Sequence, residues 1–248
     1  MKVLLVSSKT MQPRNAPQGI DVSSPHFIKD ATFLHDILSK KNPAQLQRLM
    51  HISAKLANTT VTTIKQWKPQ GGTPAWYTFI GDVYKGLEIE QFNTSMLEFA
   101  QQHCYTISGL YGLLRPLDLV QPYRLELAYK LNGKNFKNLY EFWGDRLTKH
   151  LPENEVIINL SSEEYIKVIR PYVNAKRIIT PWFYQLKDGK PKFQAVHAKN
   201  ARGAMARWIC AKQITDPLKL SEFCEDRYVY SEELSRPNAP AFIRDFIP

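Results

Sequence analysis

The stretch from Ser108 to Leu127, SGLYGLLRPLDLVQPYRLEL, places arginines, carboxylates and tyrosines among leucines that are typical of a protein core. A proline follows Arg115, and another precedes Tyr123 and Arg124, so the backbone is stiff beside both arginines. Two guanidinium groups held in this way match the geometry of a carboxylate or a phosphate. We therefore predict that Arg115, Tyr123 and Arg124 belong to a site for an anionic ligand.

The two carboxylates of the same stretch allow two interpretations. Asp118 and Glu126 would orient the arginines if the stretch forms a ligand site. In the structural alternative, Arg115 pairs with Asp118 and Arg124 pairs with Glu126 in a buried ionic network. The sequence leaves both interpretations open.

The elements that would position such a site are three short apolar runs, each of which ends in serine. They are Lys2–Ser8, Cys104–Ser108 and Glu155–Ser162. Continuous apolar runs of this length favour strands that are buried on both faces. Ligands in open α/β sheets collect beyond the carboxyl ends of the strands, where serine hydroxyl and backbone N–H groups can meet an anion. The alternative is that each serine only caps a turn or a helix.

Other charged residues fall close to these strand ends or to predicted helix starts. The segment FIGDVYKGL places Asp82 and Tyr84 two residues apart, and on an extended backbone they would face the same side. A helix predicted over 199–213 would project Lys199 and Arg202 together from its first turn. The residues predicted to line the cleft are Lys9, Asp82, Tyr84, Arg115, Tyr123, Arg124, Ser162, Tyr165, Lys199 and Arg202.

The segment Asn42–Trp67 predicts two short helices joined by a tight connector, similar to a helix-hairpin-helix. Such a module grips a phosphate backbone with connector amides and nearby basic side chains. The connector lacks the usual glycine, and a plain helical pair packed on the core is the alternative. The residues predicted to contact DNA are Arg48, Lys55, Asn58, Lys65 and Lys68.

The charge of the chain favours an anionic partner. The formal net charge is +10, and the isoelectric point is about 9.4. Residues 1–75 carry ten Lys and Arg against three Asp, and residues 165–220 carry twelve against two. Nucleic acid is one partner that such basic segments attract, and a solvated basic surface is the alternative.

Several classes of protein are not expected. Three cysteines without a CxxC pair indicate neither a disulfide framework nor a thiolate metal site, and the six histidines show no metal-binding spacing. We therefore expect no metal and no cofactor. No apolar run is long enough for a membrane span or a signal peptide, so a cytoplasmic protein is expected. Scattered prolines and the absence of repeats predict one compact mixed α/β domain over 1–248, with a central buried sheet and flanking helices.

Six segments resemble, in order and spacing, the signature blocks of the YaaA peroxide-stress family. They are SSKT, FIGDVYKGL, SGLYGLLRPLDLVQPYRLEL, LYEFWG, INLSSEEY and AKNARGAMARW, and they run from the first strand to about Trp208. The resemblance implies a cytosolic protein linked to survival of hydrogen peroxide, with less free iron and less DNA damage. It also implies a mixed α/β body that carries a helix-hairpin-helix and binds double-stranded DNA.

Three hypotheses about function follow. The first is a DNA-binding protein of the peroxide stress response that limits oxidative DNA damage and binds duplexes largely without regard to sequence. The second is an enzyme that acts on a small anionic or nucleotide-like substrate in the predicted cleft. The third is a scaffold whose charged loop is purely structural. The sequence names neither a substrate nor a reaction.

Overall fold

The computed structural model describes residues 1–245 and contains ten α-helices and thirteen strands within that range. The helices are α1 (Ile28–Ser39), α2 (Pro43–Met50), α3 (Ala54–Gln66), α4 (Ala75–Thr78), α5 (Asp82–Leu87), α6 (Thr94–His103), α7 (Leu139–Trp143), α8 (Arg146–Lys149), α9 (Glu163–Ile166) and α10 (Ala195–Lys212). The first nine strands are β1 (Lys2–Val6), β2 (Thr10–Met11), β3 (Thr73–Pro74), β4 (Phe79–Ile80), β5 (Cys104–Ser108), β6 (Gly112–Leu114), β7 (Leu119–Val120), β8 (Ile157–Asn159) and β9 (Ile178–Ile179). The remaining strands are β10 (Trp182–Lys187), β11 (Lys190–Phe193), β12 (Val229–Arg236) and β13 (Ala239–Asp245).

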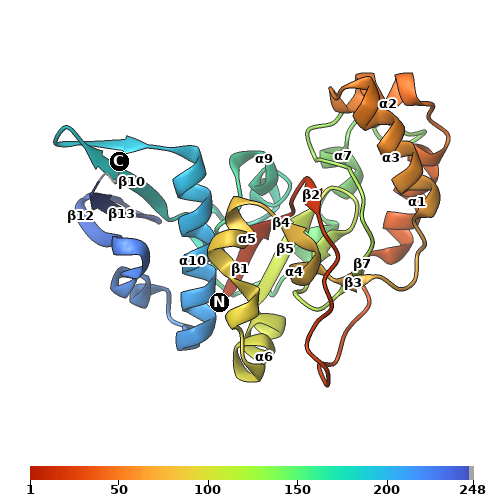
Figure 1. Cartoon of the computed structure of the whole chain (residues 1–248). Helices are drawn as coiled ribbons and strands as arrows, with labels where there is room; N and C mark the ends of the chain where they lie inside the picture. Colours follow the sequence, from red (N-terminus) through yellow and green to blue (C-terminus); the bar gives the residue numbers. More distant parts are fainter. Residues whose placement is uncertain (246–248) are drawn as a thin grey trace.

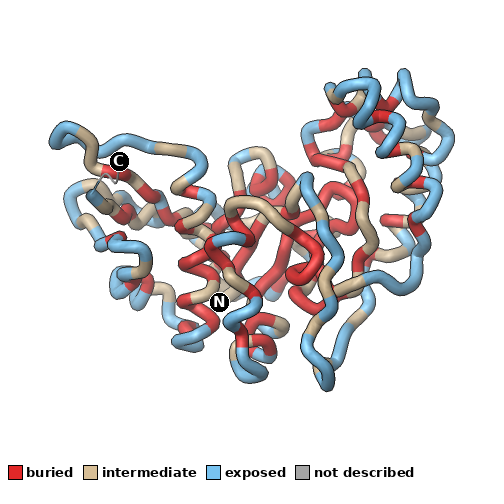
Figure 2. Tube along the Cα trace, viewed as in Figure 1, coloured by how far each residue is buried: buried red, intermediate tan, exposed pale blue. Residues whose placement is uncertain are grey.

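A five-stranded sheet in the order β6-β5-β1-β8-β9 forms the centre of the molecule (Figure 1). β1 pairs in parallel with both β5 and β8, and β6 runs antiparallel to β5. Figure 2 shows buried residues concentrated in this central region, where Val3, Leu4 and Leu5 of β1 have no exposed surface. The mixed α/β fold with a buried sheet is therefore confirmed. Because β5, β1 and β8 are parallel neighbours, their serine-bearing carboxyl ends lie at one edge of the sheet.

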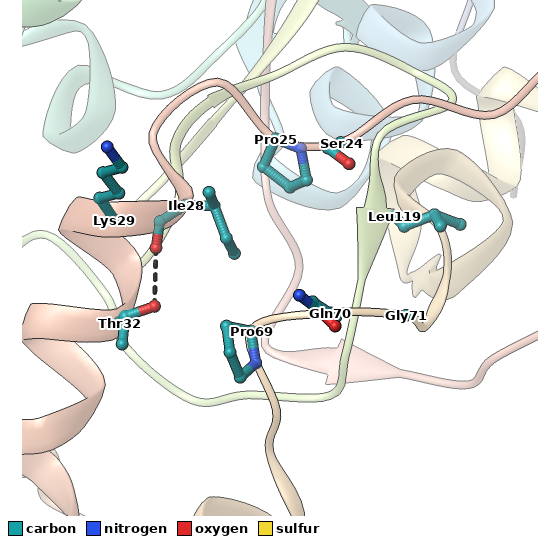
Figure 3. Close-up of a pocket in the computed structure, with 9 residues that line it drawn as sticks. All are labelled: Ser24, Pro25, Ile28, Lys29, Thr32, Pro69, Gln70, Gly71 and Leu119. Carbon is teal, nitrogen blue, oxygen red and sulfur yellow. Dashed lines mark hydrogen bonds between the residues drawn. The ribbon is translucent and has the colours of Figure 1, made fainter.

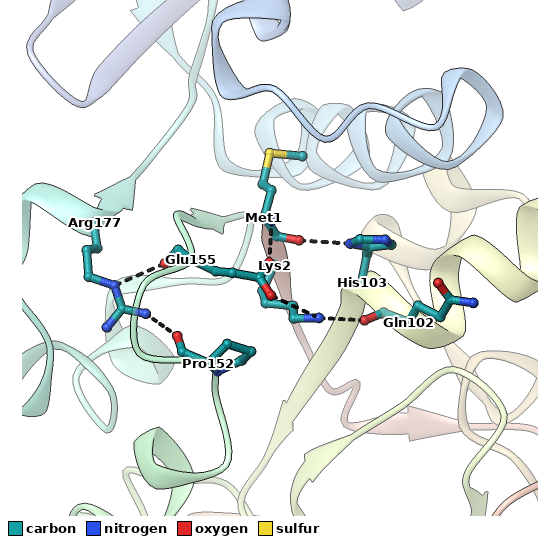
Figure 4. A network of polar contacts seen from close by, with 7 residues as sticks. All are labelled: Met1, Lys2, Gln102, His103, Pro152, Glu155 and Arg177. Atoms are coloured by element: carbon teal, nitrogen blue, oxygen red, sulfur yellow. Dashed lines mark hydrogen bonds and ion pairs between the residues drawn. The ribbon is translucent and has the colours of Figure 1, made fainter.

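Polar contacts hold the opposite, amino-terminal end of β1 in place (Figure 4). The N-terminal amine of Met1 pairs with the carboxylate of Glu155, which precedes β8. Lys2 Nζ lies 3.5 Å from the same carboxylate and donates to the carbonyl of Gln102, which precedes β5. Arg177 Nε donates to the carbonyl of Glu155 at 3.0 Å. These contacts join β1 to the segments before β5 and β8, so the relative positions of the three strands are fixed.

A second sheet, in the order β11-β10-β13-β12, lies at the end of the molecule opposite to α1, α2 and α3 (Figure 1). β10 and β11 form a hairpin around Asp188 and Gly189, and these two residues have φ values of 54° and 71°. Positive φ at both central positions matches a turn whose twist suits a two-residue hairpin. The hairpin leads directly into α10.

Helices α5 and α10 pack together unusually closely because a glycine from each lies at the contact. A Cβ on Gly203 would lie 1.8 Å from the carbonyl oxygen of Val83, and a Cβ on Gly86 would lie 2.0 Å from that of Asn200. The glycine inside the predicted C-terminal helix therefore permits a backbone-to-backbone approach. Gly86 serves the same contact from the side of α5.

Two expectations about these helices were wrong. α10 begins at Ala195 rather than at Lys199, so residues 195–198 form a first helical turn that we did not predict. Asp82 and Tyr84 lie in the helix α5 and not on an extended segment, so they do not share a side through strand alternation. A six-residue helix has little intrinsic stability, and α5 depends on packing against α10, which its local sequence does not reveal.

Within Asn42–Trp67 the chain forms α2 and α3, joined by residues 51–53. Asn42 and Gln45 form a reciprocal capping box at the start of α2, and His51 ends it in a left-handed conformation. The amides of His51 and Ile52 both donate to the carbonyl of Gln47. The connector between the two helices is thus three residues long, because α3 already begins at Ala54.

Among residues 1–245, no helix is long and apolar enough to cross a membrane.

Candidate functional site

A cavity of about 400 Å³ opens beyond the carboxyl ends of β1 and β8, where α5, α9 and α10 converge. We call it the cleft. Seven of the ten residues predicted for the ligand site line it. They are Lys9, Asp82, Tyr84, Ser162, Tyr165, Lys199 and Arg202. Predicted residues from four separate parts of the sequence therefore meet at one edge of the central sheet.

The three other predicted residues, all from the stretch 108–127, do not line the cleft. Tyr123 is buried behind it, and its hydroxyl lies 2.6 Å from Ser108 Oγ. Arg124 reaches toward the carbonyl of Lys9, with Nη1 at 3.5 Å, and its Nε is buried without a partner. Arg115 lies elsewhere and pairs with Asp118. The stretch thus divides into a first half that stabilises its own turn and a second half that approaches the cleft.

The structural interpretation of this stretch holds for one arginine and not for the other. Asp118 accepts hydrogen bonds from the Arg115 amide at 2.8 Å, from Arg115 Nη2 at 3.3 Å and from Ser23 Oγ at 2.6 Å. Glu126, in contrast, forms no ion pair with Arg124 and accepts a hydrogen bond from the Tyr165 hydroxyl at 2.8 Å. The expected pair of Arg124 with Glu126 is therefore not formed.

Of the serines at the strand ends, some line the cleft and another only caps a turn. Ser7, Ser8 and Ser162 line the cleft. Ser8 Oγ donates to the carbonyl of Ile80 and accepts from the Thr10 amide, so it stabilises the turn that leads out of β1. Ser108 Oγ accepts from the Leu110 and Tyr111 amides, as a turn-capping serine does.

Arg202 is the cation whose surroundings are least complete. It projects from α10 into the cleft, and its Nε is buried without a hydrogen-bond partner. Burial lowers the pKa of its guanidinium below the ordinary value, and the nearby Glu163 only partly offsets this. Glu163 itself forms a bidentate pair with Arg170, at 2.8 and 2.9 Å. A buried positive group without a partner is costly, so an anion in the cleft would stabilise it.

Two further cations and three carboxylates complete the charged lining. Lys199 and Lys9 are exposed at the cleft mouth, and Lys9 Nζ lies 4.0 Å from Glu126 Oε2. Asp82 lies 3.9 Å from Lys85 Nζ. Glu164 accepts from the Ala128 amide at 3.2 Å. The cleft therefore combines an unpartnered cationic wall on α10 with carboxylates on the facing elements.

Glu126 is a cleft residue that the sequence did not mark as a ligand contact. Its side chain lines the cleft, it is 5% exposed, and burial raises the pKa of its carboxyl. Tyr165, which donates to it, also accepts a long hydrogen bond of 3.5 Å from Ser7 Oγ. The only signal for this role was the position of Glu126 two residues after Arg124, which we interpreted as support for the arginine.

Tyr84 faces the cleft with a hydroxyl that is already engaged. It donates to the carbonyl of Val6 at 3.1 Å and lies 3.4 Å from Thr106 Oγ1. Burial raises the pKa of this phenol far above its ordinary value. Tyr84 therefore holds α5 against the end of β1, and it is poorly suited to exchange a proton with a ligand.

The five residues predicted to contact DNA are all exposed on or beside α2 and α3. Arg48 lies in the last turn of α2, Lys55 in the first turn of α3, and Lys65 in its last turn. None of the four cations in this set forms an ion pair with another of the described residues 1–245. We call this basic surface the α2–α3 face. It lies at the end of the molecule away from β10–β13 (Figure 1).

Two other hollows differ from the cleft in chemistry. One, of about 340 Å³, lies between the start of α1 and the chain after α3, where Pro25, Ile28 and Pro69 surround it and Lys29 stands at its edge (Figure 3). The other adjoins the cleft across Ile80, Gly81 and Tyr84. Neither is lined by a buried cation that lacks a partner.

Metal-binding and thiol chemistry find little support in the described part of the chain. No group of three or more His, Cys, Asp or Glu side chains within residues 1–245 could hold a metal ion. Cys104 and Cys210 are buried with their sulfurs 3.8 Å apart, and Cys224 is exposed. Burial and the neighbouring thiol raise the pKa of Cys210 well above its ordinary value, which disfavours the reactive thiolate.

Comparison with known proteins identifies the family. The family model described as peroxide stress protein YaaA matches residues 1–234. A UPF0246 protein of Tolumonas auensis is 43% identical over 254 residues, covering 98% of each chain. A UPF0246 protein of Ralstonia pickettii is 42% identical over 241 residues, covering 93% of this chain and 94% of the relative. The chain therefore belongs to the family of the peroxide stress protein YaaA.

Proposed function

We propose that this peroxide stress protein binds a small oxyanion-bearing ligand in the cleft and double-stranded DNA on the α2–α3 face. The observation that carries the first part is the buried, unpartnered Nε of Arg202. The second part is supported by the exposed, unpaired cations of α2 and α3. The two sites would act in one protective role, in which DNA is held close to a ligand-dependent activity.

The cleft suits an oxyanion for three reasons. The guanidinium of Arg202 offers a donor that no protein group accepts. Lys199, one helical turn earlier on α10, adds a second positive charge at the same wall. The serines that follow β1 and β8 stand at the sheet edge where ligands of α/β proteins collect. A phosphate, a sulfate or a carboxylate would satisfy these groups together.

An enzyme is the second candidate function, and the lining of the cleft supports it. Glu126 and Tyr165 are hydrogen-bonded to each other at 2.8 Å and line the same cavity as Arg202. A carboxyl whose pKa is raised by burial, beside a fixed cation, is a common arrangement in acid–base catalysis. A small anionic or nucleotide-like substrate fits this combination.

The proposed DNA contact predicts a strong dependence on salt. If the α2–α3 face contacts about five phosphates, log K for duplex DNA should fall against log salt with a slope of roughly −4 to −5. Lys55→Glu should weaken binding of every duplex sequence about equally, because phosphate contacts carry no sequence information. Fluorescence anisotropy with two unrelated duplexes measures both effects.

Lys219→Glu is the matched control for this variant, since it makes the same charge change on an exposed lysine of the C-terminal 3₁₀ helix Pro217–Glu222. This segment lies at the other end of the molecule from α2 and α3 (Figure 1). A salt slope near zero, or equal weakening by the two variants, would refute binding through the α2–α3 face.

The proposed oxyanion site predicts a large loss of affinity in Arg202→Gln. A hydrogen bond to a charged group contributes roughly 1.5–3 kcal/mol, so pyrophosphate should bind the variant about 10- to 150-fold more weakly than it binds the parent chain. Isothermal titration calorimetry with inorganic pyrophosphate measures the difference. Lys212→Gln, at the last turn of the same helix, removes an exposed cation that does not line the cleft and should leave the affinity unchanged. Equal binding by the Arg202→Gln variant would place the anion elsewhere.

A further inference from the structure

Two buried carboxylates, both from the stretch 108–127, differ in how completely they are hydrogen-bonded. Asp118 is 1% exposed and accepts from the amide and guanidinium of Arg115 and from Ser23. Glu126 is 5% exposed, accepts one hydrogen bond from Tyr165, and has Lys9 Nζ at 4.0 Å. A carboxylate has about four lone-pair positions, so Glu126 retains capacity that Asp118 has largely used. The free capacity lies on the side of the cleft.

The backbone around Glu126 packs closely against the first part of the same loop. A Cβ on Gly109 would lie 2.2 Å from the carbonyl oxygen of Leu125 and 3.1 Å from the carbonyl carbon of Glu126. The two segments of the loop therefore pack backbone against backbone. Tyr165, a residue of α9 that is 2% exposed, donates a hydrogen bond to the carboxyl.

Charged and titratable groups face Glu126 from every element around it. Those that interact with it electrostatically or share the cleft lining are Lys9 after β1, Asp82 and Tyr84 on α5, Arg124 and Tyr123 in its own loop, Tyr129 after it, Glu164 and Tyr165 on α9, and Lys199 and Arg202 on α10. The cations at the far wall can hold an anion beside the carboxyl. An anion and an ionised Glu126 would repel each other in this confined space, and a proton on Glu126 removes the repulsion.

We infer that the cleft takes up a proton together with its oxyanion, and that Glu126 is the group that binds this proton and can pass it to the ligand. This inference rests on the proposed oxyanion site. The substrate class is a small molecule with a phosphate, sulfate or carboxylate held by Arg202 and Lys199, and a basic atom within reach of Glu126. Glu126 is thereby the acid–base group of the cleft, and Tyr165 is the residue that positions it.

The transfer balances without any further reactant. The O–H bond of protonated Glu126 breaks, its electrons remain on the carboxylate, and a new bond forms between the proton and the basic atom of the ligand. The carboxylate that remains is stabilised by the Tyr165 hydroxyl at 2.8 Å and by Lys9. Tyr165 keeps its own proton, since burial and the neighbouring Glu126 raise the pKa of its phenol well above the ordinary value.

Sulfate is the probe for the test, because it keeps its charge across the mildly acidic and neutral range. Any proton taken up with sulfate in this range must therefore bind to the protein, and burial raises the pKa of Glu126 in the direction that favours such uptake. The affinity of the parent chain for sulfate should therefore fall as the pH rises, by up to about tenfold per pH unit, which corresponds to ~1 proton bound per anion. Isothermal titration calorimetry in buffers with different ionisation enthalpies measures the number of protons that bind together with sulfate.

Glu126→Gln should remove the proton uptake and make sulfate binding nearly independent of pH in this range, with higher affinity than the parent chain at the upper end. Gln keeps an oxygen that can accept from Tyr165, so the variant is expected to fold. Glu164→Gln removes a neighbouring negative charge that raises the pKa of Glu126, so the proton uptake should remain but move to lower pH. Tyr165→Phe removes the donor that favours the ionised carboxyl, so the fall in affinity should move to higher pH.

The outcomes separate this inference from the proposed function. If the parent chain binds no sulfate at any pH, the oxyanion site itself is refuted. If sulfate binds and Arg202→Gln weakens it, but Glu126→Gln leaves the proton uptake unchanged, the oxyanion site stands and the role of Glu126 is refuted. If Glu126→Gln abolishes the uptake and Glu164→Gln does not, both are supported.

Discussion

Gly203→Ala is expected to lower the melting temperature of the chain, by roughly 2–4 °C for each kcal/mol of stability lost, although alanine favours helices more than glycine does. The new Cβ would lie 1.8 Å from the carbonyl oxygen of Val83 and 2.7 Å from the amide nitrogen of Leu87. Both atoms belong to the backbone of α5, so no side-chain rotation relieves the clash. The two helices must separate, and overpacking of this kind costs about 1–3 kcal/mol or more, against ~1 kcal/mol gained in helix propensity.

The same substitution should also weaken pyrophosphate binding, because α5 and α10 both line the cleft. Gly189→Ala is the control, since that glycine lies in the hairpin turn with φ of 71° and has no atom within 4 Å of the position of a Cβ. It should cost only the strain of a left-handed residue, roughly 1 kcal/mol, and leave the cleft intact. Differential scanning calorimetry compares the two. An unchanged or higher melting temperature for Gly203→Ala would contradict the close contact of α5 with α10.

Asp118→Ala is expected to reduce the free energy of unfolding by roughly 2–4 kcal/mol, as loss of one partner from a buried hydrogen-bonded pair usually does. Three donors lose their acceptor: the amide and the guanidinium of Arg115, and Ser23 Oγ. Ser23 also accepts from Gln101, so the damage would extend to α6. Urea unfolding measures the loss. Pyrophosphate affinity should not change in the folded protein, because neither Arg115 nor Asp118 lines the cleft.

Asp118→Asn is the matched variant, and its effect should depend on pH. Burial raises the pKa of the Asp118 carboxyl above the ordinary value, so the folded chain binds this proton more tightly than the unfolded chain. The stability that the proton contributes is present below the unfolded pKa and is lost as the pH rises through the folded pKa. The stability of the parent chain relative to Asp118→Asn should therefore fall over that window.

One result for Asp118→Ala would contradict the structural role of the pair. If this variant kept its stability but lost anion binding, Arg115 and Asp118 would belong to the ligand site.

The location of the cleft could be predicted from the sequence because it follows from topology. Apolar runs that end in serine become parallel neighbours, and parallel strands bring their carboxyl ends to one edge. Lys9 and Ser162 each lie three residues after one of these strands, so their positions depend mainly on strand order. Lys199 and Arg202 could be placed together because helical spacing joins residues three apart.

The partners of individual charged groups could not be predicted in this way. Arg124 and Glu126 are close in sequence, yet the carboxyl of Glu126 turns toward Tyr165, which lies 39 residues away on α9. That choice depends on side-chain rotamers and on burial, which the spacing of residues does not encode. Arg115 paired with Asp118 as local spacing allowed, because the turn between them brings the amide and the carboxyl together.

Helix α5 shows a second limit of local reasoning. Its two glycines at 81 and 86 suggest a turn, since glycine disfavours a helix interior by about 1 kcal/mol. In the structure Gly81 is the N-cap residue before the helix, with φ of 125°, and Gly86 permits the contact with α10. The stabilising partner lies more than a hundred residues away in the chain, so only the tertiary structure reveals why this segment is helical.

The most direct test of the oxyanion site is a crystal structure of the chain grown in the presence of pyrophosphate. The proposed function predicts ordered phosphate density in the cleft, with an oxygen about 2.7–3.2 Å from Arg202 Nε and a second contact to Lys199 Nζ. The same density should be missing from crystals of Arg202→Gln grown under the same conditions. An empty cleft in the parent chain, with Arg202 Nε donating instead to a carboxylate of the protein, would contradict the account.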